Sequence, residues 1–120
     1  MTADLSVFRY HRSPARAPYD LKKAAGWGTF VRYIELHDDG FALRQVDEYA
    51  NGYLSHYDRS HWDDQFGTLA DFRFGEAWIK AWGTPDAITR SEFEEKWTAA
   101  LGSPVACLKT EPPSPQPPWL

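Results

Sequence analysis

The sequence contains a single cysteine and no long apolar run. One thiol cannot form an internal disulfide or a thiolate zinc cluster, so Cys107 excludes a disulfide scaffold, and we expect it to be a small buried apolar side chain. No stretch approaches the ~18 apolar residues of a membrane-spanning helix. No apolar segment is followed by an A-x-A cleavage pattern, which argues against a secretory signal. We therefore expect a cytoplasmic protein of one domain, without membrane association.

Recognisable catalytic signatures are also missing. The chain shows no Ser-His-Asp order, no nucleotide-binding glycine loop and no thiol–imidazole pattern. We therefore expect no cofactor, and the sequence alone does not name a reaction.

Charge is distributed unevenly along the chain, whose net charge is −4. Residues 1–32, the basic head, carry six basic and two acidic side chains, a charge of +4. Residues 33–120 carry seven basic and fifteen acidic side chains, a charge of −8. An acidic body repels a phosphate backbone, so nucleic acid is not an expected partner. We expect the head to fold back against the body or to remain solvated.

Composition divides the chain into three zones. Residues 1–26 form a basic N-terminal extension that Pro14 and Pro18 interrupt, with a short helical turn expected over residues 19–26. Residues 27–109 form a single α+β domain. Residues 110–120 hold five of the nine prolines and are expected to be an extended tail containing PxxP patterns.

The domain begins with a predicted β-meander. Residues 29–36, 41–49 and 53–58 are rich in β-branched and aromatic residues and are separated by Asp39-Gly40 and Asn51-Gly52, which favour tight hairpin turns. Alternation places Gln45 and Asp47 on one face. We expect a fourth strand over residues 69–74 and a loop over residues 59–68.

A helix is predicted over residues 89–101. Thr89 and Glu92 fit a capping box, and Phe93, Trp97 and Leu101 form an apolar stripe suited to covering one face of the sheet. Residues 75–82 are ambiguous between a short helix and a strand. The predicted fold is α+β, an antiparallel β-meander of about four strands with a C-terminal helix packed on one face.

The first candidate for chemistry is the segment from His56 to Asp64. His56 and Asp58 point to one face of a strand, and the following loop could bring His61 and Asp63 close to them. Two imidazoles and a carboxylate are the ligands of hydrolytic zinc or non-haem iron. The spacing matches no standard metal signature, so turn and capping hydrogen bonds are the preferred interpretation and no metal is expected.

A second candidate is acid–base chemistry by Asp47, Glu48, His56 and Asp58 on adjacent strands. We expect these side chains to lie on a solvated face, where Arg44 and Arg59 neutralise them. Surface ion pairs of this kind contribute only ~0.2–1 kcal/mol each.

The third candidate is the surplus of aromatic residues, which include six Trp. Trp and Tyr are enriched in protein-binding hot spots. Core packing is expected for Trp62, Trp78 and Trp97. Exposed or intermolecular contacts are expected for Trp27 and Trp119, which glycine or proline flanks. The candidate binding residues are Trp27, Trp119, Tyr49, Tyr53, Arg44 and Arg59.

Three segments resemble a group of small uncharacterised bacterial proteins. Residues 43–52 follow R-x-V-x-x-[YF]-x-[DN]-G, residues 57–62 read YDRSHW, and residues 91–97 contain E-F-E-x-x-W. The resemblance covers about half of the chain and implies a bacterial, cytoplasmic α+β protein, with no catalytic residue to carry over. Small acidic domains of this style often occur beside toxin genes as immunity proteins, a fold-level analogy.

Two functions from different classes follow. The leading one is a non-enzymatic protein-binding module, such as an immunity or inhibitor protein that masks a basic toxin surface. The alternative is a small metal-dependent or acid–base enzyme centred on residues 56–64. The oligomeric state stays open.

Overall fold

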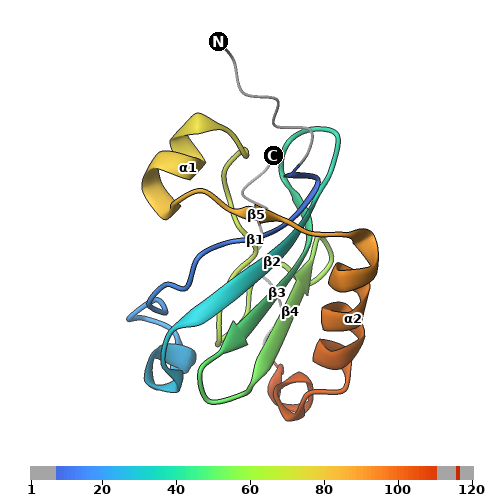
Figure 1. Ribbon diagram of the computed structural model, residues 1–120. Helices are drawn as coiled ribbons and strands as arrows, with labels where there is room; N and C mark the ends of the chain where they lie inside the picture. Colours follow the sequence, from blue (N-terminus) through green and yellow to red (C-terminus); the bar gives the residue numbers. More distant parts are fainter. Residues whose placement is uncertain (1–7, 111–115, 117–120) are drawn as a thin grey trace.

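Five antiparallel strands form one sheet in the order β4-β3-β2-β1-β5 in the computed structural model, which describes residues 8–110 and residue 116 (Figure 1). The strands are β1 (Tyr10–Arg12), β2 (Phe30–Leu36), β3 (Ala42–Tyr49), β4 (Leu54–Asp58) and β5 (Asp86–Ala87). The helices are α1 (Glu76–Trp82), α2 (Arg90–Leu101) and the 3₁₀ helices η2 (Lys23–Trp27) and η3 (Pro104–Leu108). This confirms the α+β class with a C-terminal helix packed on an antiparallel sheet.

Strands β2, β3 and β4 are the predicted meander. Both hairpin turns contain a glycine with positive φ, +83° at Gly40 and +92° at Gly52, a conformation that side-chain-bearing residues rarely adopt. In the register, Arg32 pairs with Asp47, and Asp47 pairs with Ser55. Directly paired residues of an antiparallel ladder share a face, so these three side chains lie on the same side of the sheet.

The expected fourth strand over residues 69–74 is wrong. Within residues 59–75 the structure shows one isolated bridge, between Asp63 and Thr68. The backbone amide of Ala70 donates to Oε1 of Gln45 at 2.7 Å, and the Leu69 amide donates to the carbonyl of Trp62 at 2.7 Å. These bonds go to a side chain and to the loop itself, so no ladder forms, and the segment covers the sheet face.

The remaining strands come from outside the meander. Strand β1 belongs to the segment set apart as an N-terminal extension, yet it pairs with both β2 and β5. The helical turn expected over residues 19–26 is the 3₁₀ helix η2, which continues through Gly26 to Trp27.

Four ion pairs join the basic head to the body, so the head folds back against the body and is not simply solvated. They join Arg9 to Asp38, Arg12 to Asp86, Lys22 to Asp63, and Arg32 to Asp47. Four of the six basic side chains of the head are therefore paired with carboxylates of the body.

Helix α2 covers one face of the sheet. Its capping box between Thr89 and Glu92 is present as predicted. Phe93 and Ala100 are buried against the sheet, and Trp97 is partly buried there. Leu101 does not continue the expected stripe, because it is 52% exposed at the end of the helix and Ala100 takes the inward position.

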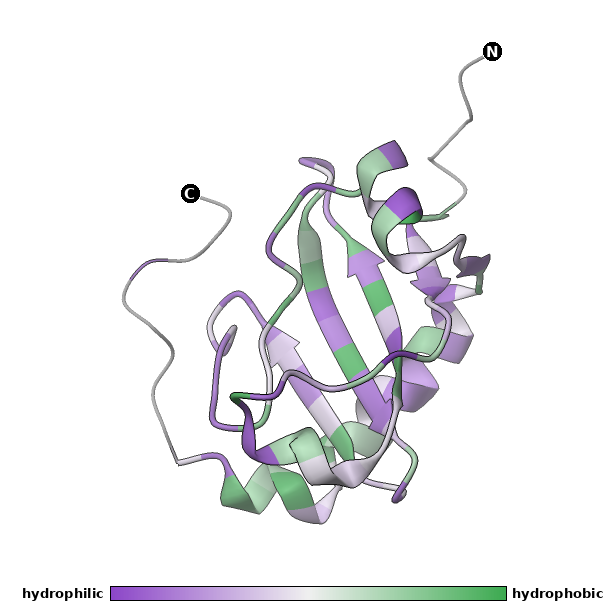
Figure 2. Ribbon diagram, turned by 90° about the vertical axis from the view of Figure 1, so that its left-hand side faces the viewer, coloured by the Kyte–Doolittle hydropathy of each residue, from purple (hydrophilic) through white to green (hydrophobic). Residues whose placement is uncertain are grey.

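The opposite face is covered by α1, η2, η3 and the segment between β4 and α1. Figure 2 shows polar and apolar residues interleaved along its central strands. Trp78 of α1 is fully buried, and Val105 of η3 packs with Phe30 and Tyr49. Cys107 is exposed, which corrects the expectation of a buried thiol, because η3 turns Val105 inward instead. Within the described residues, each helix is too short or too polar to traverse a bilayer.

Candidate functional site

The segment that follows β4 forms a compact turn, which Asp58 caps. One carboxylate oxygen of Asp58 accepts hydrogen bonds from the amide and hydroxyl of Ser60 and from the amide of His61, at 2.7–2.8 Å. Burial raises the pKa of Asp58, but these hydrogen bonds outweigh it and lower the pKa below its usual range. This is the capping interaction that the sequence favoured for Asp58.

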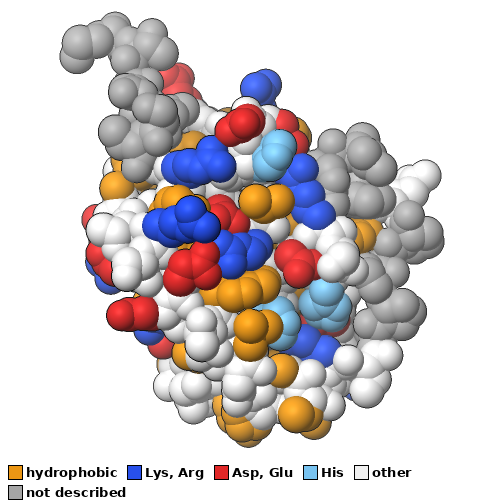
Figure 3. Space-filling model, turned by 90° about the vertical axis from the view of Figure 1, so that its right-hand side faces the viewer, with side chains coloured by type: hydrophobic (Ala, Val, Ile, Leu, Met, Phe, Trp, Pro, Cys, Tyr) orange, Lys and Arg blue, Asp and Glu red, His pale blue; other side chains and the backbone are white. Residues whose placement is uncertain are grey.

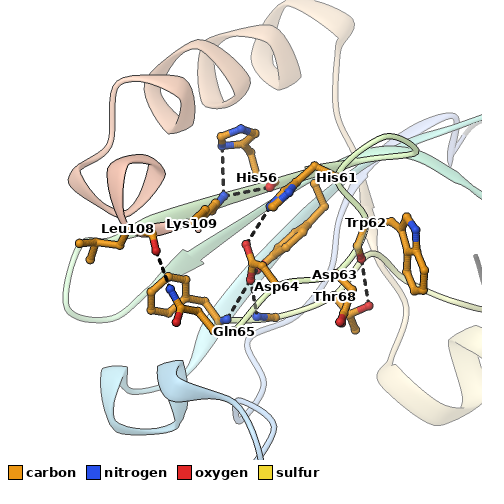
Figure 4. Close-up of polar contacts among 12 residues, drawn as sticks. His56, His61, Trp62, Asp63, Asp64, Gln65, Thr68, Leu108 and Lys109 are labelled. Atoms are coloured by element: carbon orange, nitrogen blue, oxygen red, sulfur yellow. Dashed lines mark hydrogen bonds and ion pairs between the residues drawn. The ribbon is translucent and has the colours of Figure 1, made fainter. Parts of the chain in front are cut away.

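His61 is paired with Asp64 rather than with Asp63 (Figure 4). The distance from Nε2 of His61 to Oδ2 of Asp64 is 2.9 Å. The other oxygen of Asp64 accepts from the Tyr57 hydroxyl at 2.9 Å and from two backbone amides of the loop. Burial raises the pKa of Asp64, but the bonds from His61, the backbone and Tyr57 hold it below the usual range. A carboxylate only accepts, so we assign the shared proton to Nε2 of His61.

Lys109 joins the same cluster from the far end of the chain. Its ammonium nitrogen lies 3.2 Å from Nδ1 of His56 and donates to the His56 carbonyl at 2.9 Å (Figure 4). Burial lowers the pKa of Lys109 to about 8. Burial and the positive charge of Lys109 lower the pKa of His56 to about 4. The two imidazole rings are 6.2 Å apart between centroids, so His56, His61 and Lys109 form one group of bases.

This group contains two imidazoles, an amine and the Asp64 carboxylate, which are residue types that can transfer protons. Asp63 forms an ion pair with Lys22 at 2.9 Å. Among residues 8–110 and residue 116, no three His, Cys, Asp or Glu side chains are placed to hold a metal ion. A hollow of about 390 Å³ lies elsewhere on the described surface, between Arg9, His37 and Arg73.

The expected solvated network of Asp47, Glu48, Arg44 and Arg59 is wrong. Asp47 is fully buried beneath the 59–75 segment and pairs with Arg32, at 2.9 Å to Nε and 3.2 Å to Nη2. Glu48 lies on the opposite face. The remaining partners differ from those expected as well: Glu48 pairs with Lys96, Arg44 with Glu35 and Glu94, and Arg59 with Asp39.

The aromatic candidates lie together near the turn between β3 and β4. Trp27 is partly buried, stacks on Phe66 at 5.0 Å between ring centroids, and contacts Tyr49 and Tyr53 edge-on. Tyr49 is buried, whereas Tyr53 is 37% exposed. Trp119 and the PxxP patterns lie outside the described residues.

Exposed apolar side chains gather at this same end of the sheet, which we call the hairpin-end surface. Among the described residues, the large exposed hydrophobic side chains are Leu21, Tyr53, Leu101 and Leu108. The segments that carry them are joined by hydrogen bonds from Leu54 to Ser103, from Gln65 to Leu108 and from Lys23 to Gln65. Figure 3 shows hydrophobic atoms at the lower end of one face of the molecule, as well as across its middle.

Two residues of the cluster escaped sequence reasoning. Lys109 lies 53 positions from His56, and no local pattern signals their contact. Asp64 follows Asp63, which was the predicted candidate. The sequence signal for Asp64 is the Gln65-Phe66-Gly67 turn, in which the amides of Phe66 and Gly67 donate to the preceding aspartate.

Comparisons with known proteins leave both candidate functions open. No protein-family model matches the sequence, and searches of curated proteins and of solved structures returned no match. The resemblance to small bacterial proteins therefore stays a prediction.

Proposed function

We propose that the chain is a protein-binding module that uses the hairpin-end surface. The observation that supports this proposal is that hydrogen bonds join, at one end of the sheet, the segments that carry the large exposed hydrophobic side chains of the described residues, Leu21, Tyr53, Leu101 and Leu108. Scattered exposed leucines are common, whereas a gathered apolar patch is typical of a binding surface.

The aromatic cluster beneath the patch suits this role. Phe66 and Tyr49 hold Trp27 from two sides, and Trp27 in turn contacts Tyr53. Aromatic side chains fixed in this way lose little conformational entropy when a partner binds them. The surface thus combines packed aromatic groups with the exposed side chains of Leu101 and Leu108.

A more specific form of the proposal is that the chain inhibits a basic toxin. The number of unpaired carboxylates bears on this form. Eight carboxylates form ion pairs with Lys or Arg inside the chain. Fewer carboxylates are left for a basic partner than the composition suggests. Apolar contact, more than electrostatic steering, therefore supports binding.

The test compares capture of proteins from the native host by the wild-type chain and by the double variant Leu101→Asp/Leu108→Asp. The control is Ala77→Asp/Ala99→Asp, which adds the same charge at two exposed positions of α1 and α2. We expect a protein that the wild type and the control capture at both low and high salt, and that the patch variant loses. No captured protein at either salt concentration, or equal capture by all three chains, would overturn the proposal.

A second candidate, an acid–base function of the His56–Lys109 cluster, is favoured by the lowered pKa of Lys109. An amine with a pKa of about 8 is substantially neutral, and nucleophilic, near pH 8. Reaction with acetic anhydride at pH 7.5, followed by mass spectrometry, should label Lys109 faster than exposed Lys80. Slower labelling of Lys109 would remove the support for this candidate, and elemental analysis of untagged protein separately tests its metal-dependent form.

A further inference from the structure

A row of polar side chains crosses the covered face of the sheet. The amide of Ser13 donates to the carbonyl of Arg32 at 2.8 Å, which extends the β1–β2 ladder and places the two side chains on one face. Asp47 and Ser55 continue the row across β3 and β4. The side chains of Arg32 and Asp47 are each only 1% exposed.

Arg32 is only partly satisfied within this row. Its Nε and Nη2 donate to Asp47, and Tyr19 also interacts with the guanidinium group, whereas Nη1 is buried and makes no close hydrogen bond in the described part of the chain. The Ser13 hydroxyl is also buried without a partner. A buried donor without an acceptor is costly, and most so when it belongs to a charged group.

A second arginine, Arg16, lies beside Arg32 and also has a buried donor atom without a hydrogen-bond partner among the described residues. Arg16 is half-buried, and its guanidinium carbon lies 4.1 Å from the centre of the Trp82 ring. Its Nη1 is buried without a partner, and no carboxylate among the described residues forms an ion pair with Arg16. Burial lowers the pKa of Arg16, and the nearby positive charge of Arg32 lowers it further.

Shared aromatic neighbours place the two guanidinium groups together. The carbon atoms at their centres lie 5.6 Å (Arg16) and 5.1 Å (Arg32) from the Phe30 ring centre. The corresponding distances to Trp82 are 4.1 and 6.0 Å. Backbone bonds between Arg16 and Phe30, at 2.8 and 2.9 Å, fix the segment that carries Arg16 against β2.

The charges of this group favour an anion over a neutral ligand. Asp47 pairs with Arg32 and also attracts Arg16 at longer range, so one carboxylate is shared by two guanidinium groups in the described part of the chain. The unsatisfied guanidinium atoms, Nη1 of Arg16 and Nη1 of Arg32, can only donate. Guanidinium groups match the planar or tetrahedral oxygens of carboxylate and phosphate.

We propose that Arg16, Arg32 and Ser13 form a binding site for a small oxyanion, either a phosphate or a carboxylate group. Trp82 and Phe30 exclude water from the donors, which strengthens their attraction for an anion. Arg16 is the most exposed of the three, so the ligand enters on its side. The site lies on the opposite side of the sheet from α2 and is independent of the hairpin-end surface.

The test measures binding of sodium phosphate and of sodium acetate to the full chain by calorimetry, at constant ionic strength maintained with sodium chloride. The variants are Arg16→Gln, which removes the charge, and Arg16→Lys, which keeps the charge and loses the forked donors. The control is Arg12→Gln, which removes an exposed arginine that pairs with Asp86. Arg32 is left unchanged because its loss would leave Asp47 buried and uncompensated.

We expect saturable binding of one of the two anions to the wild type and to the control. Binding should be at least about tenfold weaker in Arg16→Gln and intermediate in Arg16→Lys. Phosphate binding identifies a phosphoryl ligand, and acetate binding alone identifies a carboxylate. Absence of saturable binding at tens of millimolar anion, or equal binding by Arg16→Gln and the wild type, would overturn the proposal.

Discussion

The buried ion pair between Arg32 and Asp47 makes a strong prediction about stability. Replacing Asp47 by asparagine keeps the shape of the side chain but removes its charge. The two carboxylate oxygens accept from Nε and Nη2 of Arg32 and from the amide of Gln45, at 2.9–3.3 Å. An asparagine keeps one acceptor and turns an amide donor toward Arg32 or Gln45. The variant therefore leaves a buried cation that lacks both its counterion and part of its hydrogen bonding.

The expected loss is large compared with the stability of a chain of this size. Breaking a buried pair by removing one partner costs about 3–5 kcal/mol. A chain of this length has an unfolding free energy of roughly 6–18 kcal/mol. At roughly 3–6 °C per kcal/mol, the midpoint of thermal unfolding should fall by about 9–30 °C.

The assay is urea denaturation at pH 7.5, followed by tryptophan fluorescence, together with a thermal scan. Asp38→Asn is the matched control, because Asp38 also pairs with an arginine but its side chain is 86% exposed. The control should lose no more than roughly 0–1 kcal/mol. Equal losses in the two variants, or a loss below about 1 kcal/mol for Asp47→Asn, would refute the argument that burial makes this pair essential.

Three further predictions concern single side chains. His11 is fully buried and burial lowers its pKa to about 4, so the free energy of unfolding should fall as pH drops from the unfolded-state pKa of ~6.5 toward 4. In urea denaturation, the stability of His11→Phe relative to the wild type should therefore be ~2 kcal/mol higher at pH 5 than at pH 7.5. An equal difference between the two proteins at both pH values would contradict this. Thr89→Ala should cost ~1 kcal/mol by loss of the capping box, whereas Ser91→Ala in the same turn should cost almost nothing, and equal melting temperatures would contradict the cap. Tyr57→Phe removes a hydrogen bond to the Asp64 carboxylate and should cost ~1.5–3 kcal/mol in urea denaturation, a loss that a merely solvated hydroxyl would not produce.

The parts of the fold that depend on neighbouring residues were predictable from the sequence. Gly40 and Gly52 specify the two hairpin turns through backbone conformations that other residues rarely adopt. Thr89 and Glu92 specify the start of α2 through a hydrogen-bond exchange within one helical turn.

The parts that depend on distant residues were not predictable. Strand β1 has three residues and β5 has two, and His11 of β1 pairs with Ala87 of β5, far along the chain. Such short strands carry no period of their own. The burial of Asp47 likewise depends on the 59–75 segment, whose apolar residues suggested a strand but instead pack over the sheet.

The candidate site likewise has one part that neighbouring residues predict and one part that depends on distant residues. The capping role of Asp58 follows from the residues that come directly after it, Ser60 and His61. The contact between Lys109 and His56 requires η3 to bring the end of the chain back beside β4. A single sequence has no local signal for that return.

The position of β1 inside the sheet sets an order of assembly during synthesis. Strand β1 leaves the ribosome first, yet its partners are β2 and, much later, β5. Strands β2, β3 and β4 can pair as consecutive hairpins as soon as they emerge, whereas the partner of β5 among the described strands is β1. The first strand made must therefore wait at the edge of the growing meander, and it becomes an interior strand only when residues 86–87 arrive to close the sheet beside it.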